Sequence, residues 1–163
     1  MKSQALNLFI VDDNQLMVIG LRNYLSTRFG NNLNISTFHT GASALEKVDG
    51  DTSIVIMDYF LDNENGNDVL KSIKKINPNT EVIMLSSNED MGVAIDAFRN
   101  GATDYVVKGK KSWKKISSLV YQIITYPLHI MVKEFGINKY IAMFLLTFIA
   151  MGIGIVISLQ FIH

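Results

Sequence analysis

Three things are missing from this sequence: cysteine, a net charge, and a linker rich in proline, glycine or serine. Without cysteine the chain forms no disulfide, holds no thiolate nucleophile and builds no cysteine-ligated zinc site. Lysine plus arginine and aspartate plus glutamate number 15 each, so no overall positive field attracts nucleic acid, and we expect no nucleic-acid partner. The missing linker leaves no boundary to a second soluble domain.

The sequence does contain a regular alternation of short apolar segments and helical patterns. The predicted strands are Leu6–Val11, Leu33–Phe38, Ile54–Asp58, Glu81–Leu85 and Thr103–Val107. The predicted helices lie between Asn14 and Gly30, at Gly41–Val48, Asn65–Ile76 and Met91–Arg99, and from Ser112 onward. In the fourth helix, Ala94, Ile95 and Phe98 are expected to face inward. Five alternations of strand and helix predict an α/β fold with a doubly wound, five-stranded parallel sheet.

The strand at Ile54–Asp58 is an unbroken apolar run that ends in a carboxylate. Turn-forming residues lie on both sides of it, which is typical of a strand buried on both faces. Such a strand delivers its last residue to the carboxyl edge of the sheet, where open α/β folds bind their ligands. Packing explains an aspartate poorly at that place, and we predict that Asp58 is a nucleophile that accepts a phosphoryl group.

Polar residues stand at the ends of four predicted strands: Asp12 and Asp13, Asp58, Ser86, and Lys108. Right-handed crossovers bring these ends to one edge of the sheet. Crowded carboxylates repel one another unless a cation lies between them, and oxygen ligands are those that Mg²⁺ prefers. A lysine ammonium and a serine hydroxyl can hold the remaining oxygens of a phosphoryl group. The constellation therefore predicts phosphoryl transfer to an aspartate.

With these residues, the sequence resembles the CheY-like receiver domains of two-component response regulators over about residues 5 to 125. The resemblance implies a flavodoxin-like sheet of order 2-1-3-4-5. Gly66 stands at the position of the family's loop glycine, Gly109 replaces its usual proline after the lysine, and Leu61-Asp62 replaces its usual Met-Pro. The family's functional positions correspond to the acidic pair Asp12 and Asp13, the phosphoacceptor Asp58, the hydroxyl Ser86, the switch aromatic Tyr105 and the lysine Lys108.

The resemblance also implies a cofactor, a donor and a way of signalling. Mg²⁺ is expected at the carboxylates of Asp12, Asp13 and Asp58 and at the backbone carbonyl of Phe60. A sensor histidine kinase or a histidine phosphotransfer protein is the expected donor. On phosphorylation, Ser86 would move toward the new oxygens and Tyr105 would become buried. No independent substrate turnover is expected, so the protein is not predicted to be an enzyme beyond its own phosphorylation.

The last part of the sequence lacks charge: no Asp, Glu, Lys or Arg occurs from Tyr140 to His163. About 20 uncharged residues are enough to span a bilayer as a helix. Eleven residues between Ile141 and Leu159 are Leu, Ile, Phe or Val, and at roughly −0.3 to −0.6 kcal/mol each their insertion is favourable by about 5 kcal/mol. The predicted organisation is therefore a receiver domain at 1–125, a juxtamembrane segment at 126–139 and a transmembrane helix at 140–162.

The charges around this span predict its orientation. Lys133 and Lys139 precede the span and nothing basic follows it, so we expect a single-pass protein of the bacterial inner (cytoplasmic) membrane with the receiver on the cytoplasmic side. We interpret residues 116–132 as the last receiver helix, continuing into a segment bent at Pro127. A hairpin of two spans is the alternative. Every fourth position from 142 to 158 carries a small residue except Leu146, which supports homodimerisation in the membrane as a hypothesis: Ala142, Ala150, Gly154 and Ser158.

The sequence thus predicts a membrane-anchored receiver that is phosphorylated on Asp58 and signals by protein contact or phosphorelay. The main alternative is an adaptor that uses the receiver fold to bind a membrane partner without being phosphorylated. A phosphatase-like hydrolase with Asp58 as nucleophile is the third hypothesis. It is disfavoured because Phe60 stands where such enzymes usually have a second acid.

Overall fold

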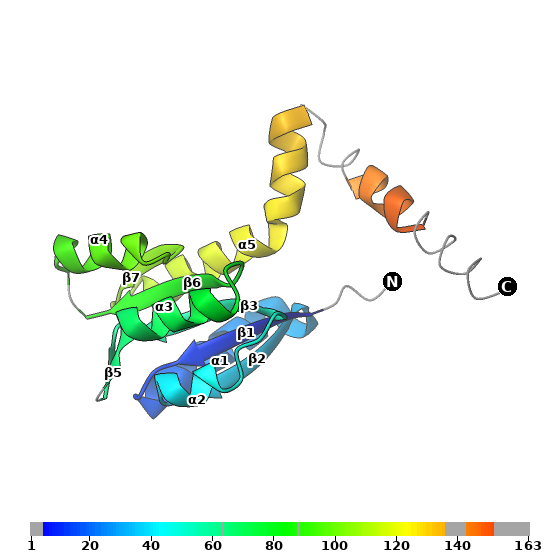
Figure 1. Cartoon of the computed structure of the whole chain (residues 1–163). Helices are drawn as coiled ribbons and strands as arrows, with labels where there is room; N and C mark the ends of the chain where they lie inside the picture. The colour runs from blue at the N-terminus through cyan, green and yellow to red at the C-terminus, as the bar shows by residue number, and fades with distance from the viewer. Residues whose placement is uncertain (1–4, 63, 88, 136–142, 152–163) are drawn as a thin grey trace, which may run out of the picture. The chain divides into compact units, whose positions relative to one another are not determined.

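The computed structural model describes residues 5–62, 64–87, 89–135 and 143–151 (Figure 1). The chain divides into two compact units, residues 1–120 and 121–163. The first unit contains every residue that the sequence analysis places at the predicted site.

The centre of the first unit is a parallel sheet of five strands. The strands are β1 (Leu6–Val11), β2 (Leu33–Phe38), β3 (Thr52–Asp58), β6 (Glu81–Ser86) and β7 (Asp104–Val107), in the spatial order β2-β1-β3-β6-β7. Every neighbouring pair in this sheet is parallel. Because β4 and β5 form a separate hairpin, this is the flavodoxin-like order 2-1-3-4-5, and the predicted fold of the receiver is confirmed.

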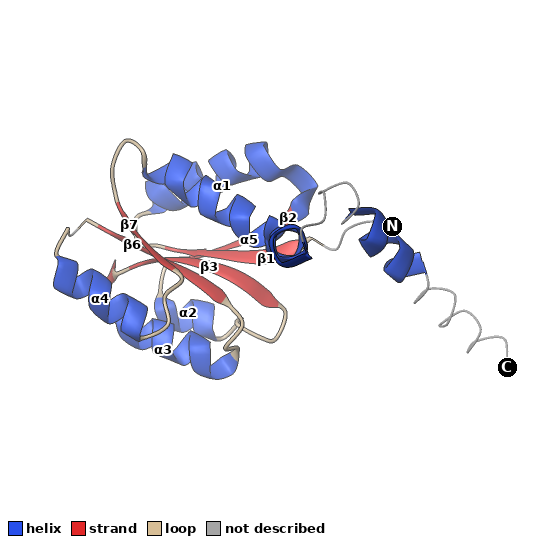
Figure 2. Cartoon of the chain, turned by 90° about the horizontal axis from the view of Figure 1, so that it is seen from above, coloured by secondary structure: helices blue, strands red, loops and turns tan. Residues whose placement is uncertain are grey.

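Helices cover both faces of this sheet (Figure 2). The helices are α1 (Gln15–Phe29), α2 (Gly41–Leu45), α3 (Gly66–Ile76), α4 (Met91–Arg99) and α5 (Ser112–Phe135), and a short 3₁₀ turn, Gly30–Asn32, follows α1. On one face, apolar residues of β1, β3 and β6 pack with α2, α3 and α4 in a single core cluster. The helices α1 and the first part of α5 cover the other face. Strand β3 is buried along almost its whole length, as expected for a central parallel strand.

Helix α4 presents a different face to the sheet from the one predicted. Ile95 and Phe98 are 43% and 50% exposed, whereas Ala97 is fully buried and Val93 and Ala94 pack against the core. The prediction that Ile95 and Phe98 face inward is therefore wrong, whereas Ala94 does face the core. The helix carries two overlapping apolar stripes, and the stripe with the smaller side chains, Val93, Ala94 and Ala97, is the one that packs against the core.

Two further features differ from prediction. Helix α2 ends at Leu45 instead of Val48, although Val48 is still buried. The segment after Asp58, expected to be a loop, contains a small antiparallel hairpin of β4 (Phe60–Leu61) and β5 (Glu64–Asn65). Hairpins with two-residue strands leave almost no periodic signal in a sequence.

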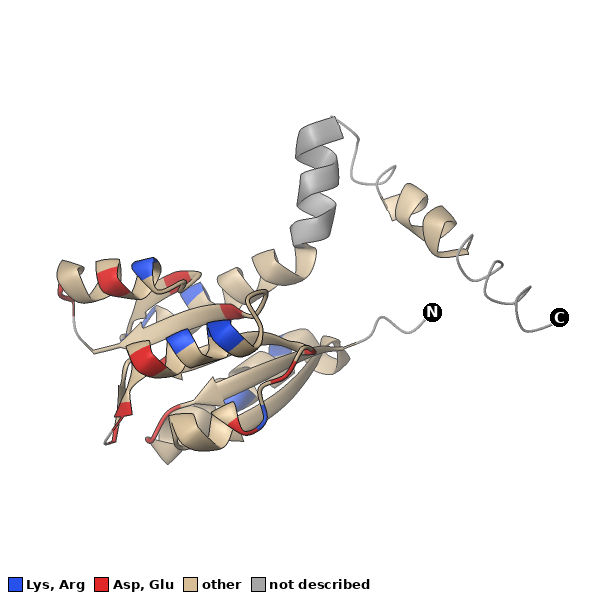
Figure 3. Ribbon diagram, in the orientation of Figure 1, with Lys and Arg blue, Asp and Glu red and all other residues tan. Residues whose placement is uncertain are grey.

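The second unit is described only in part. Helix α5 continues to Phe135, and residues 143–151 are helical and uncharged (Figure 3). Within the described residues, no helix is both long enough and apolar enough to cross a membrane. The predicted span at 140–162 lies outside the described residues apart from 143–151. Three positions of the predicted small-residue stripe, 142, 154 and 158, also lie outside them.

Candidate functional site

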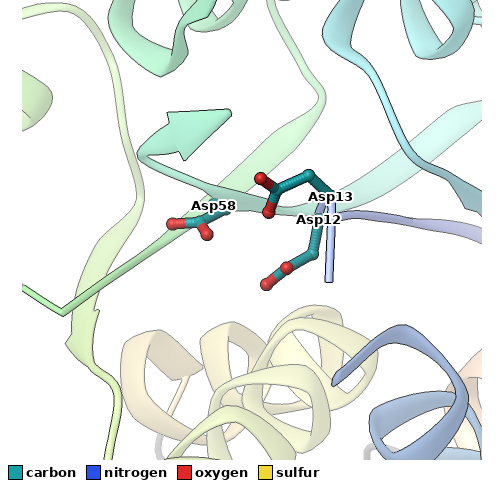
Figure 4. Close-up of side chains that lie close together, drawn as sticks. All are labelled: Asp12, Asp13 and Asp58. Carbon is teal, nitrogen blue, oxygen red and sulfur yellow. The ribbon is translucent and has the colours of Figure 1, made fainter. Parts of the chain in front are cut away.

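Three carboxylates converge at the carboxyl edge of the sheet (Figure 4). Asp12 and Asp13 follow the last residue of β1, and Asp58 is the last residue of β3. One ligand oxygen of each residue lies within 4.8 Å of those of the other two. Asp12 and Asp58 are buried, at 1% and 5% exposure, whereas Asp13 is exposed. The arrangement is open to solvent on the Asp13 side and enclosed behind the other two acids.

Asp12 is fixed by groups from the neighbouring elements. Its Oδ1 accepts a hydrogen bond from the backbone amide of Asn14 at 2.9 Å, and its Oδ2 accepts one from Lys108 Nζ at 2.8 Å. Asn14 in turn caps α1, because its side-chain oxygen accepts from the amides of Leu16 and Met17. Asn14 therefore caps α1 with its side chain and holds the Asp12 carboxylate with its backbone amide.

Lys108 bridges the two buried acids. Its Nζ lies 2.8 Å from Asp12 Oδ2 and 2.5 Å from Asp58 Oδ2, and its side chain is 20% exposed. Burial alone would lower the pKa of Lys108, but the hydrogen bonds to Asp12 and Asp58 outweigh burial and raise its pKa above the ordinary value. The backbone amide of Lys108 donates to the Ser86 carbonyl at 2.7 Å, which places the end of β7 beside the end of β6. Lys108 is thus a fixed cation between two carboxylates.

The Asp58 carboxyl is in an environment that disfavours its charge. Burial raises the pKa of Asp58 above its ordinary value, and the neighbouring Asp12 adds to the rise. The Lys108 ammonium and the amide of Phe60, which donates to Asp58 Oδ1 at 3.2 Å, act in the opposite direction without cancelling it. Two carboxylates stabilise the positive charge of Lys108, and this raises the pKa of Lys108. Asp58 shares its one cation with Asp12, so the cation does not offset burial and the pKa of Asp58 is raised as well. A second cation beside Asp58 would relieve this imbalance.

The donor set fits Mg²⁺. Hard divalent ions prefer carboxylate oxygens, and two ligands on opposite sides of Mg²⁺ lie about 4.2 Å apart. The ligand oxygens of Asp12, Asp13 and Asp58 lie within 4.8 Å of one another, and they would have to draw closer to bind one ion together, because adjacent ligands of an octahedral Mg²⁺ lie about 3 Å apart. Both oxygens of Asp12 and both oxygens of Asp58 already accept a hydrogen bond, so the exposed Asp13 is the acid that is most open to an incoming ion. The predicted fourth ligand, the carbonyl of Phe60, stays a prediction.

The remaining predicted residues lie around this cluster. Ser86 ends β6 and is fully buried, and it pairs in the sheet with Val107 of β7. Tyr105 lies in β7 and is only 8% exposed, so little of its surface is left to bury on phosphorylation. The proposed movements of Ser86 and Tyr105 stay predictions.

Gly66 explains how the chain after Asp58 folds back. A methyl group added at Gly66 would lie 2.7 Å from the Tyr59 carbonyl oxygen and 2.9 Å from that of Asp58. The Gly66 amide donates to the Tyr59 carbonyl at 3.0 Å. A residue without a side chain is therefore required for α3 to begin directly against the backbone of the Asp58 strand end.

Sequence reasoning missed two contacts near the site. The Glu64 carboxylate accepts hydrogen bonds from the amides of Gly41 and Ala42, and His39 Nδ1 lies 3.2 Å from the Asp12 carbonyl oxygen. Glu64 stands in a cluster of turn residues with no periodic pattern, and His39 is distant in sequence from every acid. No sequence signal could have found either contact, because both depend on which loops the sheet topology brings together.

Comparison with known proteins is consistent with this geometry. The family model described as "Response regulator receiver domain" matches residues 8–117. The chemotaxis protein CheY of Thermotoga maritima is 34% identical over 100 residues, which cover 61% of this chain and 82% of that protein. The response regulator VraR of Staphylococcus saprophyticus is 28% identical over 104 residues, which cover 63% of this chain and 49% of VraR. The chain thus spans about half the length, or less, of the first curated relatives it matches.

Solved structures show the same fold. The response regulator domain of Thermotoga maritima CheB superposes with a TM-score of 0.60 at 27% identity, over 74% of this chain and 93% of that domain. A beryllium fluoride-activated receiver domain of DrrB superposes with a TM-score of 0.64 at 24% identity, over 74% of this chain and 97% of that domain.

Proposed function

Because this chain belongs to the response regulator receiver family, we propose that it accepts a phosphoryl group on the carboxylate of Asp58 and signals in that state. The observation that carries the proposal is the position of Lys108, which lies within hydrogen-bond distance of both Asp12 and Asp58 at the edge where three carboxylates meet. An ammonium there can hold an oxygen of a phosphoryl group on Asp58. A histidine kinase or a histidine phosphotransfer protein is the proposed donor.

The proposed chemistry is the transfer of a phosphoryl group from a phosphohistidine to the carboxylate of Asp58. One carboxylate oxygen of Asp58 attacks the phosphorus of a phosphohistidine, a phosphorus–oxygen bond forms, and the phosphorus–nitrogen bond breaks with its electron pair left on the imidazole. Asp58 must be deprotonated to attack. Mg²⁺, held by Asp13 and Asp58 with Asp12 behind them, would neutralise negative charge on the transferred group. Lys108 orients the equatorial oxygens, and the amide of Phe60 directs one Asp58 oxygen.

The phosphorylated state differs from the free state mainly in charge. Phosphorylation adds roughly −1.5 to −2 charges next to Lys108 and Ser86. We propose that Lys108 turns from Asp12 toward the new oxygens and that Ser86 donates to one of them. The signal then leaves by contact with another protein or by phosphorelay.

We further propose that residues 140–162 anchor the receiver in the inner membrane, with the receiver in the cytoplasm. Two observations support the anchor: the uncharged sequence from 140 to 163, and the exposure of the apolar side chains in the described stretch 143–151. Phe144, Phe148 and Met151 are each at least 60% exposed there. Lipid is the solvent that would cover them. An anchor keeps the receiver close to membrane-bound kinases and so raises their effective concentration.

The experiment that tests phosphorylation uses the full chain in mild detergent. Incubation with acetyl phosphate and Mg²⁺ should add one phosphoryl group to the intact mass, and a chelator should prevent the addition. Asp58→Asn should abolish it, whereas Asp68→Asn should not, because Asp68 is an exposed acid at the start of α3. A wild-type chain that gains no mass would support the adaptor hypothesis instead. An Asp58→Asn chain that gains as much as the wild type would show that another residue accepts the phosphoryl group.

A further inference from the structure

The turn between β2 and α2 touches both loops that carry the predicted metal ligands. On one side it is bound to the acidic pair: the Asp12 amide donates to the Phe38 carbonyl at 3.2 Å, and the ring Nδ1 of His39 lies 3.2 Å from the Asp12 carbonyl oxygen. These two contacts enclose the peptide groups on both sides of Asp12. These contacts couple the position of the turn to the position of the acidic pair.

On its other side the same turn is bound to the hairpin that follows Asp58. The two oxygens of Glu64, in β5, accept from the backbone amides of Gly41 and Ala42, the latter at 3.0 Å. Glu64 pairs with Leu61 across the hairpin, and Phe60 begins the opposite strand two residues after Asp58. Glu64 thus connects the chain that follows the phosphoacceptor to the turn that holds the acidic pair.

The local chemistry explains why a carboxylate is needed here. The first amides of a helix lack intrahelical partners. In α2, the side chain of Thr40 satisfies the Ser43 amide, and Glu64 satisfies those of Gly41 and Ala42. An amide side chain at position 64 offers only one acceptor oxygen, and its NH₂ would face a backbone N–H. Gly41 is also required, because a methyl group there would lie 2.6 Å from Glu64 Oε2 and 2.4 Å from Val69 Cγ2.

We propose that Glu64 is a positioning residue for the divalent ion: it clamps the β4–β5 hairpin to the β2–α2 turn, and so fixes the spacing between the acidic pair and the backbone that follows Asp58. This inference rests on the proposed function, because it concerns the same metal site. Glu64 itself touches neither the ion nor the phosphoryl group. Its effect is the one known for groups that orient metal ligands from behind, whose loss typically weakens metal binding about 10- to 100-fold.

The alternative is that Glu64 only stabilises α2, and Thr40 provides the matched control. Thr40 caps the same helix, and its side chain has no contact with the hairpin among the hydrogen bonds of the described residues. Thr40→Ala should lower the melting temperature of the chain, as should Glu64→Gln. Only Glu64→Gln should change the affinity for Mg²⁺. A purely structural role predicts the same metal affinity for both variants at equal loss of stability.

The test is a calorimetric titration of the full chain in detergent with Mg²⁺, followed by phosphorylation with acetyl phosphate at low and saturating Mg²⁺. Glu64→Gln should raise the Kd for Mg²⁺ about 10-fold and slow phosphorylation at low Mg²⁺, and saturating Mg²⁺ should restore most of the rate. Gly41→Ala, which displaces the Glu64 carboxylate from the opposite side, should act in the same direction. Thr40→Ala should bind Mg²⁺ like the wild type.

The remaining outcomes distinguish a failure of the clamp from a failure of the proposed function. If the wild type binds Mg²⁺ and is phosphorylated, but Glu64→Gln binds Mg²⁺ equally well or Thr40→Ala weakens binding as much, the clamp is overturned and the proposed function stands. If the wild type neither binds Mg²⁺ nor gains a phosphoryl group, the proposed function is overturned, and the clamp with it.

Discussion

Asp58 has to lose its proton to act, yet its surroundings raise its pKa and so make the proton harder to remove than from an aspartate in water. Burial raises the pKa of this carboxyl, Asp12 adds like-charge repulsion, and the single ammonium of Lys108 is shared between the two acids. Mg²⁺ binds only the deprotonated carboxylate, so binding displaces a proton whenever Asp58 holds one. Metal binding and the ionisation of the nucleophile are therefore linked at this residue.

We expect the affinity for Mg²⁺ to fall as the pH is lowered through the raised pKa of Asp58, and to level off above that pKa. Calorimetric titrations of the full chain from about pH 4, near the ordinary pKa of an aspartate, up to about pH 8, in two buffers of different ionisation enthalpy, measure the affinity and the protons released. Asp58→Asn carries no proton to displace, and both the pH slope and the proton release should disappear. An affinity that does not change with pH in the wild type would contradict this assignment.

The same shift has a defined sign for stability. The folded chain holds the Asp58 proton more tightly than the unfolded chain, so the contribution of Asp58 to stability is lost as the pH rises from about 3.9 through the raised pKa. Bound Mg²⁺ should offset this loss, because it favours the deprotonated folded form. Melting temperatures in chelator and in Mg²⁺ should therefore diverge as the pH rises. Parallel curves would show that Asp58 is not a ligand.

Removal of Lys108 should leave two buried carboxylates without their cation. Lys108→Met should lower the free energy of unfolding in chelator by about 2–4 kcal/mol, because an unpaired buried charge is strongly destabilising. Mg²⁺ should recover a larger part of the loss than in the wild type, since it replaces the missing positive charge. Chemical denaturation with and without Mg²⁺ measures both quantities.

The matched control for that variant is Lys71→Met. Lys71 pairs with Asp68 at 3.2 Å on the surface of α3, where both side chains are at least half exposed. Surface pairs of this kind contribute about 0–1 kcal/mol, so the control should change little. Equal losses for the two variants would mean that the Lys108 pairs contribute no more than a surface ion pair.

Helix α1 packs closely against α5 at the ring of Trp113. A methyl group added at Gly20 in α1 would lie 2.6 Å from the ring of Trp113 in α5, and this ring also packs against Tyr24 at 5.7 Å between centroids. Gly20→Ala should therefore destabilise the chain by about 1–3 kcal/mol through overpacking, even though alanine is the better helix former. Gly50→Ala meets open space and should have little effect. Denaturation midpoints at an unchanged m-value measure the difference, and a Gly20→Ala chain as stable as the wild type would contradict the contact.

The elements also show what the sequence could and could not specify. Strand β3 was predictable because a strand buried on both faces is a continuous apolar run between turn residues, whereas β2 was predictable from apolar residues that alternate with polar ones. The polar strand ends then had to share one edge. The face of α4 was not predictable: two apolar stripes overlap on it, and only packing against β6 and β7 selects the stripe with Ala97. The β4–β5 hairpin was not predictable either, because its two-residue strands leave almost no periodic signal, and the Glu64 contact was not predictable because its partners lie more than 20 residues away.

At the scale of the whole molecule, the match to the receiver family ends at residue 117, and the first compact unit ends at residue 120. All residues of the proposed site, from Asp12 to Lys108, lie inside that unit. Phosphorylation should therefore be independent of the sequence after α5. Whatever the C-terminal part does, it can be altered without loss of the acid cluster.

The membrane anchor can be tested on that basis. Ile149 and Met151 lie near the middle of the predicted span and are 56% and 63% exposed. An arginine at the centre of a span opposes insertion by about 2.5–3.5 kcal/mol, so Ile149→Arg with Met151→Arg should cancel the roughly 5 kcal/mol that favours insertion. We expect the wild-type chain to stay with membranes after washes in high salt and alkaline carbonate, and the double arginine variant to be released.

The matched control, Ile149→Leu with Met151→Leu, should stay bound. All three chains should still gain a phosphoryl group on Asp58, and a wild-type chain that high salt alone removes would show attachment by charge at the surface instead of a span.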